Sequence, residues 1–381
     1  MKNRRFQAKL WLIVSMGACS IGTSAISSWA QDRTPRTGWG DKETVESATT
    51  DIAPDLQALF DRSTRANSVI EFNSVVEGCR TIAKDTTRSA AERDYAKKLL
   101  SWGANRRGEI RTDMAAQMVR DGHIEEATKL DLSAAEDFAL SIQYDDSRWR
   151  AHHNLGVVLA LAGEVNAAIQ AFGKTIERQP KFAEAYFNRA ELRAQQEDWT
   201  NALVDYDKAI ELSPDDAGMH TARAKARTYA ENLDGALADY ETAMRLQPES
   251  GEAATDYADM CQSMARWKEA ASAYQKAMQL TPNDPRALQN AAWMMATCPD
   301  EYFRNPETAL KTAMRAIEAS EGEVNAHRLH VLSVAQAANG DFSSAVASIN
   351  EAMQLTTDPV LRKELAQHRA LFQRKKPFVQ P

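Results

Sequence analysis

Proline, glycine and cysteine are scarce in this sequence, and their scarcity excludes several classes of protein. The 381 residues include 12 prolines, 16 glycines and 4 cysteines. Such a composition is neither collagen-like nor low-complexity. No C-x-x-C pair is present, and a chain of this length does not need disulfides for stability. We therefore expect Cys79, Cys261 and Cys298 to be buried thiols.

The chain also has fewer basic than acidic residues. The net charge is −7, and the segment 1–30 contains Lys2, Arg4, Arg5 and Lys9 without any acid, so the remaining chain is more acidic still. Binding to nucleic-acid phosphates or to anionic lipid depends on Lys and Arg. We therefore expect no nucleic-acid partner and no polybasic membrane patch.

The motifs of common enzymes are absent as well. The sequence contains no G-x-x-x-x-G-K, G-x-G-x-x-G, G-x-S-x-G or H-E-x-x-H. We expect neither catalysis nor a cofactor. An enzymatic alternative would have to use Glu191, Asp259 and His153.

Two pairs of histidines raise the question of a metal site. Adjacent residues on a helix point in different directions, so His152 and His153 would not converge. His327 and His330 share a helical face, but we find no nearby cysteine or carboxylate that would complete a site. The sequence therefore predicts no bound metal.

The beginning of the chain has the pattern of an export signal. The basic residues precede an apolar stretch that starts at Leu10, and small residues flank Trp29. This pattern predicts a signal peptide over 1–30 that is cleaved after Ala30, and a flexible linker over 31–53. The mature protein would be periplasmic or extracellular in a bacterium.

Two alternatives for this segment stay open. The tetrapeptide that ends at Cys19, Met-Gly-Ala-Cys, resembles a bacterial lipobox, in which Cys19 would be lipidated and would anchor the chain to a membrane. Residues 10–30 also lack charge, so they could be retained as an anchor, although their Ser, Gly and Thr make such a helix marginal in lipid.

A single repeat spacing, thirty-four positions long, dominates the rest of the chain. It relates four prolines, four aromatic residues eight positions before them and four alanines twelve positions before them. These residues are Pro180, Pro214, Pro248 and Pro282; Phe172, Tyr206, Tyr240 and Tyr274; and Ala168, Ala202, Ala236 and Ala270. Each period fits two amphipathic helices, in which alanine permits close contact, the ring fills the gap and proline ends the second helix. One pair cannot bury its apolar face, so the pairs must stack.

Residues 183–216, AEAYFNRAELRAQQEDWTNALVDYDKAIELSPDD, resemble a tetratricopeptide repeat along their whole length. Other segments match in register, and we predict six units: 149–182, 183–216, 217–250, 251–284, 285–325 and 326–359. An insertion, CPDEYFR, lengthens the turn inside the fifth unit. The resemblance implies an all-α fold, an α-solenoid that forms a right-handed superhelix of about eight antiparallel helix pairs.

The flanking segments fit the same pattern less closely. Residues 54–148 are expected to form degenerate helical repeats, with an insertion that lengthens both helices of one pair. Residues 68–84 fit a second helix, with a partner at about 54–66. A capping helix and tail are expected over 360–381.

A charge pattern supports this register. Units with Arg at the seventh position carry Asp at the twenty-third. We predict partly buried ion pairs between packed helices. The pairs are Arg107 with Asp137, Arg189 with Asp205, and Arg223 with Asp239.

In tetratricopeptide arrays the first helices line a concave groove, and the resemblance implies which residues face it here. They include Arg150, His153, Phe187, Glu191, Lys225, Asp259, Gln289, Trp293 and His330. Their charges mix signs and lack the Lys/Asn arrangement with which chaperone-binding members hold a terminal carboxylate. Phe187 and Trp293 are the best candidates for peptide anchors, because large rigid aromatics dominate binding energy. Either ring could instead pack against a neighbouring repeat.

The resemblance therefore implies a non-enzymatic scaffold that binds a protein or peptide segment in this groove. A second hypothesis is a lipid-anchored envelope component, tethered through Cys19, that self-associates into a homo-oligomer through its convex face. A third is a protein that binds a small ligand in the groove.

Overall fold

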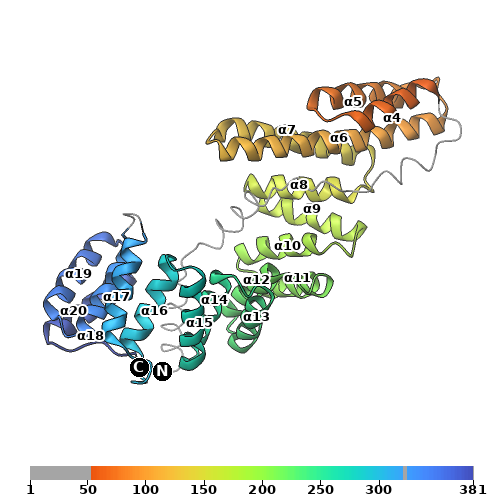
Figure 1. Ribbon diagram of the computed structural model, residues 1–381. Coiled ribbons are helices and arrows are strands. Elements are labelled where there is room, and N and C mark those ends of the chain that lie inside the picture. The colour runs from red at the N-terminus through yellow and green to blue at the C-terminus, as the bar shows by residue number, and fades with distance from the viewer. Residues whose placement is uncertain (1–52, 321–323, 381) are drawn as a thin grey trace. The chain divides into compact units, whose positions relative to one another are not determined.

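A computed structural model describes residues 53–320 and 324–380. The predicted signal peptide, the lipobox and nearly all of the predicted linker lie outside these residues. The described chain contains 17 helices and no strand. It divides into two compact units, 53–214 and 215–380, and each is a stack of antiparallel helix pairs (Figure 1). The predicted all-α solenoid is confirmed.

The first unit consists of four helix pairs. They are α4 (Pro54–Arg65) with α5 (Val69–Lys84), α6 (Ala90–Arg120) with α7 (Ile124–Tyr144), α8 (Trp149–Leu161) with α9 (Val165–Arg178), and α10 (Ala183–Gln195) with α11 (Trp199–Leu212). The pair α6 and α7 has 31 and 21 residues and contains the expected insertion. Ser68 and Ser89 begin α5 and α6 with capping boxes, each closed by a glutamate three residues later.

The second unit consists of four pairs and a final single helix. They are α12 (Ala217–Tyr229) with α13 (Leu233–Leu246), α14 (Gly251–Ser263) with α15 (Trp267–Leu280), α16 (Pro285–Thr297) with α17 (Pro306–Glu318), and α18 (Ala326–Ala338) with α19 (Phe342–Leu355), followed by α20 (Pro359–Gln373). The tail, 374–380, follows α20 without regular structure.

The periodic prolines lie just beyond the ends of second helices. Helices α9, α11, α13 and α15 each end two residues before a proline of the series. The residue between them leaves the helical region because the proline ring disfavours it there: Gln179, for example, has φ −135° and ψ 78°. Proline therefore sets the turn that leads into the next first helix.

The turn inside a repeat has a left-handed residue at its fifteenth position. Gly163 and Gly340 have φ of 79° and 87°, and at the same position Glu197, Glu231 and Ala265 have φ of 60°, 62° and 58°. Only glycine adopts this region without a steric penalty, so the turns that contain Glu197, Glu231 and Ala265 are strained.

The fifth unit has Pro299 at the position of this left-handed residue. Because the proline ring fixes φ near −65°, the short turn cannot form there. Helix α16 ends at Thr297 and α17 begins only at Pro306, so the insertion forms the longer connection that the sequence predicts.

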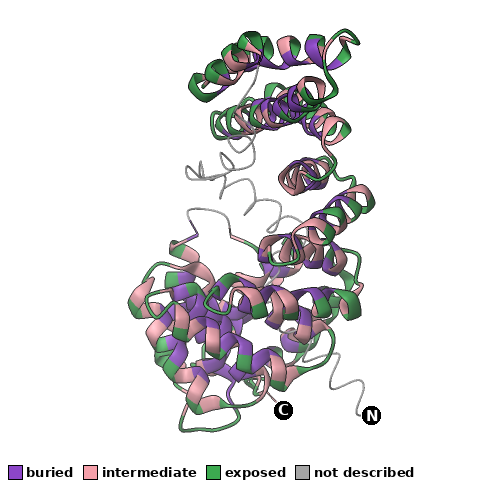
Figure 2. Ribbon diagram, turned by 90° about the vertical axis from the view of Figure 1, so that its right-hand side faces the viewer, coloured by how far each residue is buried: buried purple, intermediate pink, exposed green. Residues whose placement is uncertain are grey.

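The core of each repeat is a contact between a small residue and an aromatic ring. Ala168, Ala202, Ala236 and Ala270 are fully buried, and the four periodic rings are buried with them. A Cβ on Gly156 would lie 2.8 Å from the ring of Phe172. Buried residues accordingly follow the sides on which helices pack (Figure 2). The three described cysteines are buried free thiols, as predicted.

Candidate protein-binding face

The residues predicted to face a groove all lie on first helices of the pairs. Side chains at positions two, five and nine of the repeats are called the first-helix face below. They lie on α8, α10, α12, α14, α16 and α18, and the same register continues onto α20 at Leu361, Glu364 and His368. Several neighbouring first helices contact one another directly within each unit: α8 contacts α10, α14 contacts α16, and α16 contacts α18. The part of the face in each unit is described by itself.

In the first unit, the α8 residues pack against aromatic rings. The guanidinium of Arg150 lies 4.5 Å from the ring centroid of Trp149. The imidazole of His153 lies 4.9 Å from the ring of Phe182, edge to face, and 5.5 Å from that of Phe172. Both residues are half-buried. His153 is therefore part of an aromatic cluster at the surface.

On α10, Phe187 and Glu191 both contact Tyr206 of the same repeat. The rings of Phe187 and Tyr206 are 6.0 Å apart, and the buried hydroxyl of Tyr206 donates a hydrogen bond to the Glu191 carboxylate. Burial, reinforced by this carboxylate, raises the pKa of Tyr206 well above its usual value. Phe187 is half-exposed.

In the second unit, Lys225 is exposed, whereas Asp259 belongs to a buried polar network. Asp259 accepts hydrogen bonds from Tyr274 at 2.6 Å, from Asn290 at 2.8 Å and from Arg286 at 2.6 Å. Arg286 also donates to Asp256 at 2.5 Å. Burial opposes the charge of Arg286, but the two carboxylates outweigh it and raise its pKa well above its usual value. Asp259 therefore joins repeats together.

Gln289, Trp293 and His330, which the resemblance places on the groove, are buried in this structure. Their exposed fractions are 7%, 1% and 4%. The tail covers this end: the ring of Phe378 lies 5.8 Å from that of Trp293, and the backbone N–H of Gln380 donates to the carbonyl of Thr297 at 2.8 Å. Trp293 packs against its own chain. Whether these residues bind a partner stays a prediction.

The argument against a metal near His330 is wrong in one respect, because a carboxylate does lie beside it. His330 meets Glu364 and His368 of α20, and one ligand atom of each lies within 4.8 Å of the others. His330 Nε2 and His368 Nδ1 share a hydrogen bond of 2.7 Å. His327 is not part of this cluster.

Sequence reasoning missed Glu364, His368 and Phe378. The repeat spacing contains the signal for two of them, because one full period leads from His330 to Glu364 and from Val334 to His368. Both continue the first-helix face onto α20, for which the sequence analysis predicts only a capping role. Phe378 lies in a segment without periodicity, so no pattern places it.

The three predicted ion pairs are confirmed, and each contains a second arginine that the sequence analysis did not identify. Each aspartate is bound by two arginines one helical turn apart on the same first helix. Arg107 and Arg111 bind Asp137, Arg189 and Arg193 bind Asp205, and Arg223 and Arg227 bind Asp239. Because each carboxylate binds both arginines, these groups hold the two helices of a repeat together.

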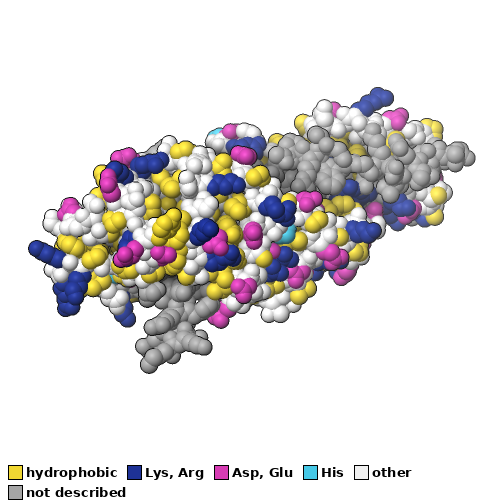
Figure 3. Space-filling model, turned by 60° about the horizontal axis from the view of Figure 1, so that its bottom comes forward, with side chains coloured by type: hydrophobic (Ala, Val, Ile, Leu, Met, Phe, Trp, Pro, Cys, Tyr) yellow, Lys and Arg dark blue, Asp and Glu magenta, His cyan; other side chains and the backbone are white. Residues whose placement is uncertain are grey.

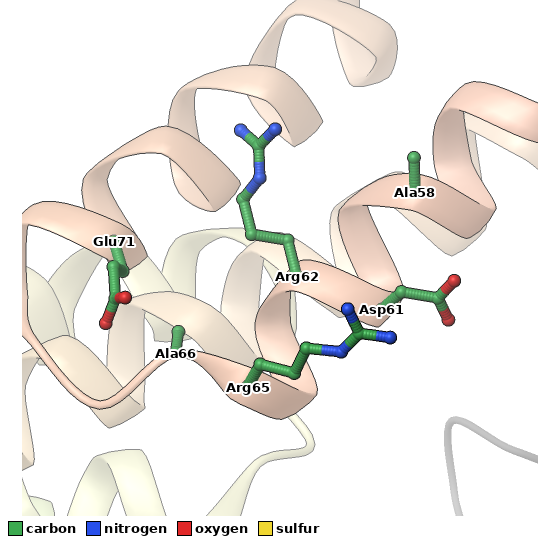
Figure 4. Close-up of a pocket in the computed structure, with 6 residues that line it drawn as sticks. All are labelled: Ala58, Asp61, Arg62, Arg65, Ala66 and Glu71. Atoms are coloured by element: carbon green, nitrogen blue, oxygen red, sulfur yellow. The ribbon is translucent and has the colours of Figure 1, made fainter.

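A pocket in the first unit lies between α4 and α5 (Figure 4). Asp61, Arg62, Arg65 and Glu71, all exposed, line it together with two alanines. The two arginines extend in different directions and do not converge on one point. Glu71 already accepts the backbone N–H groups of Asn67 and Ser68 as a helix cap. The pocket therefore offers mixed, solvated charge.

The groups named for an enzymatic alternative are engaged in structural contacts. Glu191 accepts from Tyr206, Asp259 accepts from three donors, and His153 packs between aromatic rings. Charged side chains of both signs are interspersed on the surface in Figure 3. No helix among the described residues is long and apolar enough for a membrane span.

Comparisons with known proteins agree with the repeat architecture. Residues 183–216 and 221–285 match two sequence families, both described as tetratricopeptide repeat. None of the curated proteins compared with the chain matches it.

Three solved structures of similar fold illustrate the likeness. YrrB, described as a tetratricopeptide protein with an unusual peptide-binding site, is 23% identical, with 52% of this chain and 99% of that one covered and a TM-score of 0.41. A tetratricopeptide repeat protein from Parabacteroides merdae is 17% identical, with coverages of 70% and 98% and a TM-score of 0.45. PilF of Pseudomonas aeruginosa is 14% identical, with coverages of 70% and 99% and a TM-score of 0.44. The family matches identify residues 183–216 and 221–285 as tetratricopeptide repeats, and the stacked helix pairs continue the same architecture through the described chain.

Proposed function

We propose that this protein is a non-enzymatic scaffold that binds extended protein or peptide segments on its first-helix face. The observation that carries the proposal is the position of its own tail. Residues 374–380 lie without helical structure against the first-helix face of α16 and α20, with one aromatic side chain and one backbone hydrogen bond as contacts. These are the two kinds of contact by which an extended peptide is commonly held.

The tail would occupy the face as an internal ligand. Phe378 is half-buried between Trp293 and His368, with ring distances of 5.8 and 4.0 Å. Burial of part of a phenylalanine side chain contributes about 1–2 kcal/mol. The tail follows α20 directly, so its effective concentration at the face is in the millimolar range or above. A partner at this end must compete with it.

Among the described residues, no tail segment lies over the part of the face in the first unit. Phe187 is half-exposed there, and its ring packs against that of Tyr206. A rigid aromatic ring in a fixed position loses little entropy when a partner covers it. We expect Phe187 to be the anchor for a partner in this unit, with Arg150 and Glu184 as charged neighbours.

The test uses the tail itself as the probe. A chain that ends at Gln373 is mixed with a labelled peptide of residues 374–381, and binding is followed by fluorescence anisotropy. We expect saturable binding that weakens at least tenfold when the peptide carries Phe378→Ala. The full-length chain should bind the same peptide at least tenfold more weakly, because its face is occupied. Equal binding of the two peptides, or no binding by the shortened chain, would contradict the proposal.

We further propose that the chain is exported, and this proposal rests on residues 1–30 alone. Mass spectrometry of the mature N-terminus distinguishes the alternatives. A chain that begins at Gln31 supports cleavage after Ala30, and a chain that begins at a lipidated Cys19 supports the anchored form, in which self-association at a membrane becomes the better hypothesis. An N-terminus at Met1 would contradict cleavage.

A further inference from the structure

Three side chains of the kinds that bind metals meet beneath the tail. We propose that His330, Glu364 and His368 form a site for one divalent transition-metal ion, with Zn²⁺ as the best match. His330 lies on α18, and Glu364 and His368 lie on α20. One ligand atom from each lies within 4.8 Å of the other two. This inference is independent of peptide binding.

The helix geometry explains why the three groups converge. Glu364 and His368 are four residues apart, so they project from the same side of α20, one turn above the other. Helices α18 and α20 pack against each other, which brings His330 to this side. The site therefore joins the last full repeat to the final helix.

The donor set selects the class of metal. Two imidazole nitrogens and one carboxylate oxygen occur together in zinc sites with three protein ligands and one open position. Calcium and magnesium prefer ligand sets made of oxygen alone. A borderline divalent ion such as Zn²⁺ therefore fits these residues better.

Glu364 is a carboxylate without a partner. Within the described residues, its carboxyl group is half-buried and makes no hydrogen bond or ion pair. A partly buried carboxylate is costly unless an opposite charge lies beside it, so a bound cation would stabilise this arrangement.

Aromatic rings surround the cluster. The ring of Phe378 lies 4.0 Å from that of His368, and the ring of Trp293 lies 5.2 Å from that of His330. An apolar shell excludes water and strengthens the attraction between an ion and its ligands. The buried indole N–H of Trp293 has no hydrogen-bond partner in the described part of the chain. It is a donor beside the cluster for the carboxylate or for a metal-bound water.

One adjustment is needed for an ion to enter. The 2.7 Å between His330 Nε2 and His368 Nδ1 is a hydrogen-bond distance. Two nitrogens on one tetrahedral zinc ion are about 3.3 Å apart. The imidazoles must separate by roughly half an ångström, and metal binding replaces their hydrogen bond.

The test is a metal titration of the untagged full-length chain after treatment with a chelator. Co²⁺ is added first, because its visible absorption reports four-coordinate binding, and Zn²⁺ is then used to displace it. We expect one ion per chain and a rise in the melting temperature with Zn²⁺. Glu364→Gln should weaken Zn²⁺ binding at least tenfold. His327→Gln, one turn from His330 and outside the cluster, should leave the affinity unchanged.

The glutamine variant also separates loss of the site from loss of the fold. It removes a buried carboxyl without a partner, so the metal-free variant should melt no lower than the metal-free native chain at pH 8. It retains all four cysteines, so thiol binding would persist in it. Binding of less than one ion per chain, or equal Zn²⁺ affinity in Glu364→Gln, would overturn the proposal.

Discussion

Arg189 binds Asp205 as a fork: its Nε and Nη2 atoms each donate a hydrogen bond of 2.8 Å to a different oxygen of the carboxylate. Asp205 is 2% exposed, and Arg193 donates to it as well at 2.6 Å. The fork joins α10 to α11 inside one repeat. The same arrangement recurs in the next repeat between Arg223 and Asp239. This buried pair fixes how the two helices of a repeat lie against each other.

The first prediction concerns this pair. Arg189→Leu leaves the buried Asp205 with Arg193 alone, and we expect the free energy of unfolding to fall by about 2–3 kcal/mol, because the buried carboxylate loses one of its two charged partners. Urea denaturation measures the change. The control is Lys208→Ala, which removes an exposed pair with Glu211 and should cost less than about 1 kcal/mol. An Arg189→Leu variant as stable as the native chain would show that the fork is not structural.

The second prediction concerns the left-handed turns. Ala265 is exposed and has φ 58°, so Ala265→Gly relieves backbone strain without loss of packing. We expect a gain of about 0.5–1 kcal/mol, because the relief exceeds the added entropy of the unfolded chain. Gly340→Ala is the matched reverse change: its Cβ would meet nothing within 4 Å, so only its φ of 87° opposes it. It should lower stability by about 1 kcal/mol. Thermal denaturation measures both changes. A lower melting temperature for Ala265→Gly, or a higher one for Gly340→Ala, would contradict this account.

The sequence predicts the repeats well because their contacts are local and periodic. Proline, aromatic ring and alanine recur at one spacing, and the partners Arg189 and Asp205 lie in adjacent helices of one repeat. The left-handed turns were missed because three of them lack glycine. The packing of the helices on either side compensates the backbone strain of these turns. The residue types in the turns therefore do not indicate a left-handed conformation.

The end of the binding face could not be predicted in the same way. Trp293 has the position of a groove residue, but Phe378 covers it from a distant part of the sequence, in a segment without periodicity. A contact between a repeat and a non-repetitive tail produces no periodic pattern in the sequence. The repeat register could have placed Glu364 and His368 on the first-helix face. They were not identified because α20 was predicted only as a capping helix.

The third prediction concerns the thiols. Burial raises the pKa of Cys79 to about 12 and that of Cys261 to about 11. At pH 8 both thiols are therefore protonated, and both are closed to solvent. We expect neither to react with iodoacetamide in the native protein, and both to react in urea, as measured by peptide mass spectrometry. Rapid labelling of either cysteine in the native state would show that its core opens.

The central claim is that partners bind on the first-helix face. The most direct measurement is site-specific photo-crosslinking in the cells that make the protein, with benzoylphenylalanine placed at Lys225 or at Glu241. Both residues are exposed and belong to the same repeat, but Lys225 is on the first helix, α12, and Glu241 is on the second, α13. We predict crosslinks to a defined protein segment from position 225 and none from position 241. Crosslinks from position 241 alone would place the partner on the opposite side and contradict the account.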